Sequence, residues 1–176
     1  LDLTDKKARK TLERLIATCD VFAASVRYAG LKRLGLAYED VAAIKPDIVY
    51  VHAAGYGSEG PYAGKPAYDD LIQSASGLAD VLPRVDGNPV PRILPTLVAD
   101  KVSGLFLSQA VTAALLHKER TGEGQFVEVP MFETMAAWLM VEHLWERTFS
   151  DEGEVGYTRL LARTRKPFRT LDGWMA

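Results

Sequence analysis

The segment that most limits the fold of this chain of 176 residues is DIVYVHAA, at residues 47–54. Its β-branched and apolar side chains fall at both odd and even positions, so a strand formed here has two apolar faces. Such a strand is typical of a parallel sheet that helices cover on both sides. Shorter strands are predicted at residues 21–24 and 125–129, with helical segments between them. This alternation predicts an α/β fold with a mainly parallel sheet.

Apolar residues at helical spacing predict helices over residues 4–19, 38–44, 68–78, 101–117 and 131–147. Thr4 is the expected N-cap of the first helix, and Asp100 is the expected N-cap of the fourth. Glycine and proline mark loops after residue 24, at 55–66 and at 83–95. The loop at 55–66 leaves the carboxyl end of the clearest strand, which is where active sites of open α/β sheets are found.

Charge and composition exclude several classes of partner. The net charge is -2 and the sequence pI is near 6.0, which argues against binding nucleic acid through its phosphates. No apolar run is long enough to cross a membrane, and no signal peptide opens the chain. The single Cys19 cannot form an internal disulfide, and its apolar neighbours predict a reduced, buried thiol. We therefore expect a soluble, cytoplasmic protein.

The two ends of the sequence predict a segment of a longer protein. The chain begins at Leu1, and it ends soon after an Asp172-Gly173 turn that leads into apolar residues. Such a turn is typical of a β-hairpin, so we expect a hairpin whose return strand is absent.

No metal-binding or nucleotide-binding motif is complete. The three histidines lie far apart and lack a second ligand at metal-binding spacing, so each is predicted to be structural. Residues 55–60 have the G-x-G-x-x-G spacing, but Pro61 and Gly64 stand where a dinucleotide-binding helix should begin. The backbone of this loop can still approach a ligand.

Asp100 is the most suggestive single residue. It ends an apolar run and opens a helix, whose positive end would favour the ionised carboxylate. A helix cap is the alternative role, since aspartate is common at that position. The residues alone leave both roles open.

Six short motifs are spread over nearly the whole chain. They are residues 33–36 (RLGL), 55–57 (GYG) with 60–62 (GPY), 66–69 (PAYD), 73–77 (QSASG), 99–100 (AD) with Gly104, and 121–125 (TGEGQ). In their order and spacing, these motifs resemble those of the class III CoA-transferases (the CaiB/BaiF family).

The resemblance implies a Rossmann-like large domain and a smaller domain, in a homodimer of two interlocked chains. By that comparison, residues 1–149 are part of the large domain without its first units. Residues 150–176 are then a polar linker and the start of the small domain. The implied substrates are coenzyme A, as an acyl-CoA, and a small carboxylic acid, with no tightly bound cofactor.

The resemblance also implies roles for several residues. Asp100 matches the family's catalytic aspartate, which would attack the thioester and form covalent intermediates. Asp69 would assist by bonding to the reacting aspartate or by shaping the CoA pocket, although a cap or salt-bridge role is an equal alternative. Gly55 and Gly57 would lie beside the thioester, where backbone N–H groups could stabilise an oxyanion, or would simply turn the chain.

Arg27 and Arg33 match positions near the CoA nucleotide, where a guanidinium suits phosphate. The family's usual Asn-Phe-Arg-Pro-Gly is SVRYA here, at residues 25–29, which puts the local CoA contacts in doubt. Tyr68 is also predicted to contact CoA. Racemases of the family carry a histidine at that position as a second base, so tyrosine favours a transferase. An α-methylacyl-CoA racemase and a non-catalytic CoA-binding relative remain the alternatives.

Overall fold

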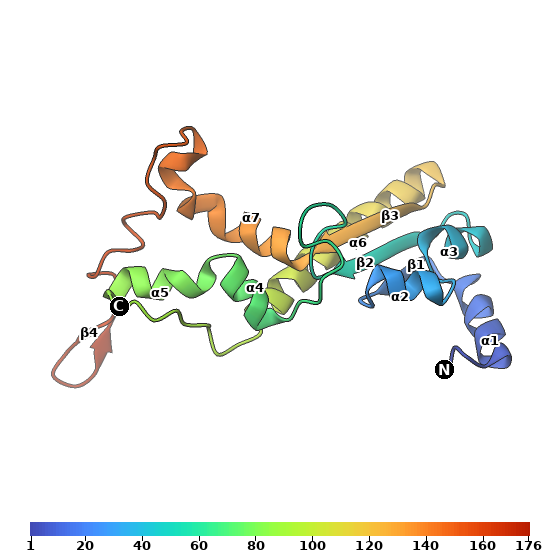
Figure 1. Ribbon diagram of the computed structural model, residues 1–176, viewed down its shortest axis with the longest axis horizontal. Helices are drawn as coiled ribbons and strands as arrows, with labels where there is room; N and C mark the ends of the chain where they lie inside the picture. Colours follow the sequence, from blue (N-terminus) through green and yellow to red (C-terminus); the bar gives the residue numbers. More distant parts are fainter.

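The computed structural model describes residues 1–176 as an elongated molecule with its termini toward opposite ends (Figure 1). Its helices and strands are, in order, α1 (Lys6–Ile16), β1 (Val21–Ala24), α2 (Tyr28–Arg33), α3 (Tyr38–Ile44), β2 (Val49–Ala54), α4 (Asp69–Ala75), α5 (Leu78–Asp86), α6 (Val98–Thr121), β3 (Gln125–Pro130), α7 (Met131–His143), the 3-10 helix η1 (Trp145–Thr148), β4 (Phe168–Arg169) and β5 (Trp174–Met175).

The main sheet has three strands in the order β1-β2-β3, and both pairs are parallel. Val49 of β2 lies opposite Val21 on one side and Gln125 on the other. Helices α2 and α3 connect β1 to β2, and α4, α5 and α6 connect β2 to β3. The predicted α/β fold with a parallel sheet is therefore confirmed.

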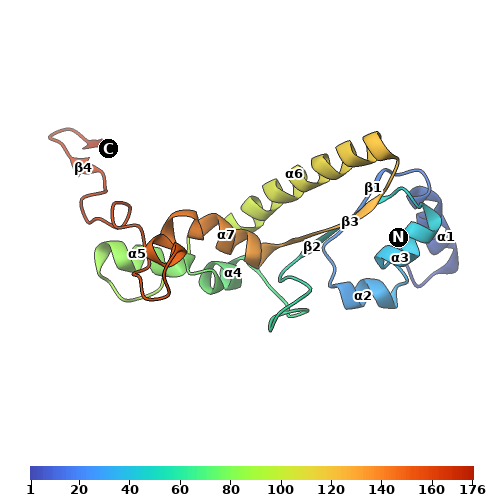
Figure 2. The same ribbon diagram turned by 90° about the horizontal axis from the view of Figure 1, so that it is seen from above.

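Both faces of the central strand are covered, as its sequence predicts. Val49 and Val51 pack against Ala114 of α6 on one face. Ile48, just before the strand, and Tyr50 face the opposite side and join a cluster built from α1, α2 and α3. Figure 2 shows α6 along one face of the sheet and α2 and α3 along the other. Burial raises the pKa of the Tyr50 phenol above its usual range, and its O–H donates to the Leu36 carbonyl at 2.7 Å.

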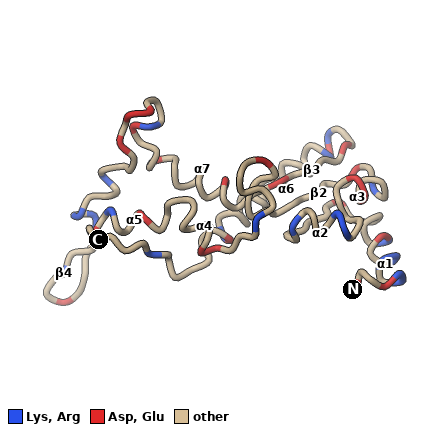
Figure 3. The backbone as a smooth tube through the Cα atoms, viewed as in Figure 1, with Lys and Arg blue, Asp and Glu red and all other residues tan.

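A third cluster lies beyond the carboxyl ends of the strands. Ile72 of α4, Ala99 in the first turn of α6 and Met135 of α7 are each fully buried and pack together. This cluster fixes the start of α6 between two other helices. Acidic and basic residues are both distributed along the whole length of the chain (Figure 3). None of its helices is long and apolar enough to cross a membrane.

Three local predictions in the first third of the chain were wrong. Asp5, and not Thr4, caps α1, because its side chain accepts the N–H of Ala8 at 3.0 Å. Cys19 is exposed rather than buried, since it follows the end of α1. Residues 28–33, read as loop, form α2, which is held by the buried Leu31.

The predicted helix over residues 68–78 is two helices, separated at Gly77, whose φ of 89° breaks the first. The second, α5, runs through Pro83, so the predicted loop at 83–95 begins four residues later. Proline lacks the N–H that would bond to the carbonyl of Ala79. That carbonyl instead accepts the N–H of Arg92 at 2.9 Å, which lets the helix continue without an unpaired group.

Helix boundaries later in the chain also differ from the predicted ones. α6 begins at Val98, so Asp100 is its third residue and not its N-cap, which is Leu97. α7 stops at His143, before the η1 turn. The predicted hairpin at Asp172-Gly173 is present. Its return strand was expected to be absent, but it is there as β5, two residues long.

The polar segment at 150–156 folds back on α7. The carbonyl of His143 accepts the N–H of Gly156 at 2.8 Å, and the rings of Trp145 and Tyr157 stack at 4.7 Å. The Arg84 side chain of α5 donates to the carbonyl of Val155. The division at residue 149 stays a prediction.

Candidate functional site

Two adjoining cavities open at the carboxyl end of β2, the edge of the sheet at which the sequence predicts a site. The first, the Asp100 cavity, has a volume of about 390 Å³. The second, the aromatic cavity, has a volume of about 300 Å³. The two share a wall made of Ser25, Arg27, Ala53, Ala54, Gly55 and Lys65. A ligand in one cavity therefore lies next to the other.

Asp100 lines the first cavity from the first turn of α6. Its side chain is exposed, and no hydrogen bond or ion pair reaches the carboxylate. The free N–H groups of the first turn give that end of the helix a positive potential, which favours an anion there. Ser103 follows one turn later and lines the same cavity, and its hydroxyl is buried without a partner.

Asp69 is 5% exposed and binds the backbone of Asp100. Its Oδ2 accepts the N–H of Asp100 at 3.0 Å, and its Oδ1 accepts the side-chain amide of Gln73 at 2.6 Å. The N–H of a third helical residue has no partner inside its own helix. Asp69 therefore caps α6 from α4, and the structure brings both predicted catalytic carboxylates together at one helix start.

The glycine-rich loop is tied down by carboxylates. The N–H of Gly57 donates to Glu133 Oε1 at 3.0 Å, and the N–H of Ser58 donates to Glu128 Oε2 at 3.0 Å. The N–H of Gly57 is thus already bonded and not free for an oxyanion in this conformation. Gly55 lines both cavities, and a Cβ on it would lie 2.5 Å from the Cβ of Ala67, so only glycine fits.

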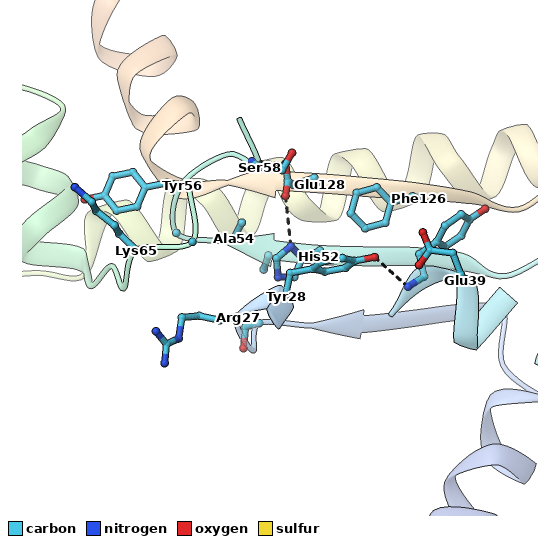
Figure 4. A pocket seen from close by; sticks show the side chains of 15 residues that line it. Arg27, Tyr28, Glu39, His52, Ala54, Tyr56, Ser58, Lys65, Phe126 and Glu128 are labelled. Carbon is cyan, nitrogen blue, oxygen red and sulfur yellow. Dashed lines mark hydrogen bonds and ion pairs between the residues drawn. The ribbon is translucent and has the colours of Figure 1, made fainter. Parts of the chain in front are cut away.

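The aromatic cavity lies beside β2 and β3, and Tyr28 and Phe126 are among the residues that line it (Figure 4). His52, which the sequence analysis took as structural, lines this cavity and is 4% exposed. Its Nε2 lies 3.1 Å from the carbonyl of Val26, and its Nδ1 lies 3.5 Å from Glu128 Oε1. His52 thus connects the altered 25–29 segment to β3, while the second oxygen of Glu128 holds the glycine-rich loop.

Two cations stand where the cavities meet. Arg27 and Lys65 line both cavities, and Figure 4 shows their side chains at the same end of the aromatic cavity. Tyr68 lines the Asp100 cavity and is 74% exposed. Arg33 lines neither cavity, because it ends α2 on an exposed face. Of the two arginines predicted near CoA, only Arg27 lines the Asp100 cavity.

No group of three or more His, Cys, Asp or Glu side chains is placed to hold a metal ion. The chemistry that the cavities offer is that of a carboxylate without a partner, with two cations and several hydroxyl groups around it.

A family model described as CoA-transferase family III matches residues 1–176. This chain belongs to that family. Its α/β fold agrees with that of a CAIB/BAIF family protein from Brucella suis, which is 28% identical with a TM-score of 0.82, covering 98% of this chain and 46% of the other. The predicted family is therefore confirmed.

Two further relatives are similar over most of the chain. Rv3272 from Mycobacterium tuberculosis is 31% identical over 190 residues, which cover 99% of this chain and 47% of that protein. An acetyl-CoA:oxalate CoA-transferase from Acetobacter aceti is 33% identical over 157 residues, which cover 89% and 40%. The chain thus spans about half the length of the relatives it matches.

Several residues that shape the site were not singled out from the sequence. Gln73 was part of the motif at residues 73–77 but was given no role of its own. Ser103, Glu128 and Glu133 were not singled out. Glu128 is the one charged residue in the strand QFVEVP, and this is a signal that could have marked it as functional. Glu133, in the first turn of α7, carries no signal of its contact, because its partner Gly57 is 76 residues away.

Proposed function

We propose that the protein transfers coenzyme A from an acyl-CoA to a carboxylic acid, with Asp100 as the covalent nucleophile. The observation that carries this proposal is the Asp100 carboxylate, which faces a cavity of about 390 Å³ with no partner while its backbone N–H is held by Asp69. A nucleophile needs a free lone pair and a fixed position. Membership of CoA-transferase family III supports the same chemistry.

In the first half of the reaction, an Asp100 oxygen attacks the thioester carbonyl of the donor. A C–O bond forms and the C–S bond breaks, which gives a mixed anhydride and CoA thiolate. The thiolate then attacks the aspartyl carbonyl. A new C–S bond forms and the anhydride C–O bond breaks, which releases the donor acid as a carboxylate and leaves an aspartyl-CoA thioester.

The second half reverses these steps with the acceptor. The acceptor carboxylate attacks the aspartyl thioester, and the thiolate leaves. The thiolate then attacks the acceptor's acyl carbon, which frees Asp100 and the new acyl-CoA. No electrons are gained or lost, and no metal ion or resident cofactor is required. Asp100 is exposed in this chain, so groups beyond those lining the cavity must exclude the water that would hydrolyse both intermediates.

The cations at the shared wall fit anionic substrates. We assign Arg27 to the phosphates of CoA, because a guanidinium binds phosphate with two parallel hydrogen bonds. Lys65 stands at the same wall and would attract the acid's carboxylate. Tyr68 and Gly55 line the Asp100 cavity and would border the pantetheine arm. Gly57 would support this arm only indirectly, through the loop. Arg33 stays a prediction without a place at either cavity.

Two further expectations stay proposals, namely a homodimer and a cytoplasmic location. A homodimer is supported by apolar side chains that α6 and α7 leave exposed, among them Leu105 at 73% and Val141 at 82%. Sedimentation of the whole protein would test it, and a monomer at micromolar concentration would overturn it.

The decisive experiment treats the whole protein with a panel of acyl-CoA thioesters and hydroxylamine, followed by peptide mass spectrometry. Hydroxylamine converts an activated aspartyl group to a hydroxamate, which we expect on the peptide containing Asp100. Asp100→Asn keeps the shape of the side chain but should give no adduct. Asp80→Asn, at an exposed position in the first turn of α5, is the matched control and should react as the wild type does.

Other results would point elsewhere. Solvent deuterium at the α-carbon of a branched acyl-CoA, without an adduct, would indicate a racemase. CoA binding with neither adduct nor exchange would indicate a non-catalytic relative. Either result would overturn the covalent mechanism.

A separate binding experiment tests the CoA assignment. Arg27→Ala should weaken CoA binding about 10-fold or more, since a hydrogen bond to a charged group contributes on the order of 1.5–3 kcal/mol. Arg33→Ala, which removes the same charge away from both cavities, is the comparison. Equal losses in the two variants would refute the placement of the phosphates at Arg27.

A further inference from the structure

Gln73 of α4 is fully buried and holds together two segments that meet at the start of α6. Its Nε2 donates to Asp69 Oδ1 at 2.6 Å and lies 3.2 Å from the carbonyl of Thr96 and 3.4 Å from that of Leu94. Its Oε1 accepts the N–H of Leu94 at 2.8 Å. Every polar atom of the side chain is therefore used.

Only one orientation of this amide satisfies its surroundings. With Nε2 toward Asp69 and the two carbonyls, two N–H groups meet three acceptors. The reverse orientation would place the amide oxygen against a carboxylate and two carbonyl oxygens. It would also place the NH₂ group of Gln73 against the N–H of Leu94, so that two donors would meet. A side chain at this place must donate on one side and accept on the other, which is the chemistry of an amide.

The contacts of Gln73 lead directly to Asp100. Leu94 and Thr96 belong to the segment that enters α6, and this helix has no side-chain cap of its own at Leu97. Asp69 supplies the missing acceptor to the N–H of Asp100, and Gln73 fixes the other oxygen of the same carboxylate. One residue thus orients both the segment before the helix and the group that caps it.

We propose that Gln73 is a positioning residue for the reaction at Asp100, acting by orienting Asp69 and the 94–96 segment so that the Asp100 carboxylate faces its cavity. This inference rests on the proposed function, because it assumes that Asp100 is the nucleophile. Gln73 lines neither cavity, so its effect on the reaction is indirect.

Gln73→Glu separates positioning from simple packing. The variant has nearly the same shape, but the new carboxylate, when ionised, cannot donate to Asp69 and repels it. When protonated, the new carboxyl group regains one donor toward Asp69 and keeps the acceptor for Leu94. Besides Asp69, the titratable groups in the first turns of α6 and α7, which pack against α4, are Asp100, Lys101 and Glu133. Lys101 Nζ donates to Thr96, and Glu133 binds Gly57.

The experiment measures the single-turnover rate of acylation of Asp100 in the whole protein between pH 8 and pH 5, with CoA binding measured in parallel. We expect Gln73→Glu to acylate about 10- to 100-fold more slowly than the wild type at pH 8, since small misplacements of a reacting group cost that much. The ratio to the wild type should rise as the pH falls, and CoA should bind within about two-fold of the wild-type affinity. Gln73→Met, which cannot donate at any pH, should stay slow throughout.

Hydrogen exchange at the amides of Leu94 and Asp100 gives a readout independent of turnover. Both variants should exchange faster at Asp100 at pH 8, because Asp69 loses its partner in each. Gln73→Met should also exchange faster at Leu94, since it alone lacks an acceptor for that N–H. Ser74→Ala is the control, because Ser74 is exposed on the same helix and its hydroxyl bonds only to the carbonyl of Asp70. Exchange equal to that of the control would overturn the role of Gln73, even if Gln73→Met proved too unstable to assay.

Two failures can be distinguished. A wild-type protein that forms no adduct at Asp100 overturns the proposed function, and with it the reaction that Gln73 would serve. The wild-type protein could instead form the adduct while Gln73→Glu reacts equally fast, or more slowly by the same factor at every pH. Either result would overturn the positioning role alone.

Discussion

Asp69→Asn should destabilise the protein far more than Asp70→Asn, because each oxygen of the Asp69 carboxylate accepts a hydrogen bond. The side chain accepts from the Gln73 amide at 2.6 Å and from the Asp100 N–H at 3.0 Å, and it is 5% exposed. An asparagine side chain has one oxygen that accepts and one NH₂ group that only donates. Whichever way it turns, its NH₂ group faces either the Gln73 NH₂ group or the Asp100 N–H.

The size of the effect follows from these two contacts. A hydrogen bond to a charged group contributes on the order of 1.5–3 kcal/mol, and a buried donor left without a partner costs about 1–3 kcal/mol. Asparagine can keep one contact as a neutral bond and must lose the other. We therefore expect a loss of about 2–4 kcal/mol in the free energy of unfolding. Rotation of Gln73 cannot recover it, since that would break the bond from Leu94.

Urea denaturation followed by circular dichroism measures this loss. Asp70→Asn is the matched control, since it removes the same charge from the same first turn of α4 at an exposed position. The control should change the unfolding free energy by no more than about 0.5 kcal/mol, as is usual for surface substitutions. If the two variants were equally stable, the reasoning that Asp69 caps α6 would be refuted.

Two further predictions concern the opposite end of the sheet. The pKa of the Asp47 carboxyl is held well below its usual range, first by the hydrogen bond from Lys45 and then by the one from Lys118. A lowered pKa stabilises the fold above the unfolded-state value, near 3.9, and this stabilisation is lost as the pH falls through the folded-state pKa. Lys118→Met should thus lower the melting temperature at pH 7, and its difference from the wild type should shrink below about pH 4. A difference in melting temperature at about pH 2 equal to that at pH 7 would contradict this. Gly124→Ala should lower the unfolding free energy by about 1–3 kcal/mol, because its Cβ would collide with the carbonyl oxygen of Ile48, and chemical denaturation that finds no loss would contradict it.

The sheet could be predicted because its signals are local. β2 has apolar side chains on both faces, and α6 is apolar over much of its length, so each element is marked by its own residues. The alternation of strands and helices then favours parallel pairing. The same local logic failed at α5, where Pro83 is a breaker by itself. Its effect is removed by Arg92, which supplies the carbonyl of Ala79 with another donor.

The site could be predicted only in part, for a related reason. Asp100 and Asp69 were found through their motifs, but the contact between them spans 31 residues and has no sequence signal. Gln73 reaches Leu94 across 21 residues, and an amide in an amphipathic helix is usually a surface residue. His52 was taken as structural because no metal ligand accompanied it. Its place in the aromatic cavity depends on Tyr28 and Phe126, which other elements supply.

The sequence left two roles open for Asp100, a helix cap or a reacting group, and its contacts favour the second, which stays a proposal. Capping requires an acceptor for the free N–H groups of the first turn of α6, and Asp69 provides it from α4. Asp100, at the third position, makes no such bond, and its carboxylate turns to the cavity. Two carboxylates at one helix start are expected to have different roles, because a second capping carboxylate would repel the first and add little stabilisation. This division supports Asp100 as the reacting group, and it explains why replacing Asp69 should change stability first, whereas replacing Asp100 should change only the chemistry.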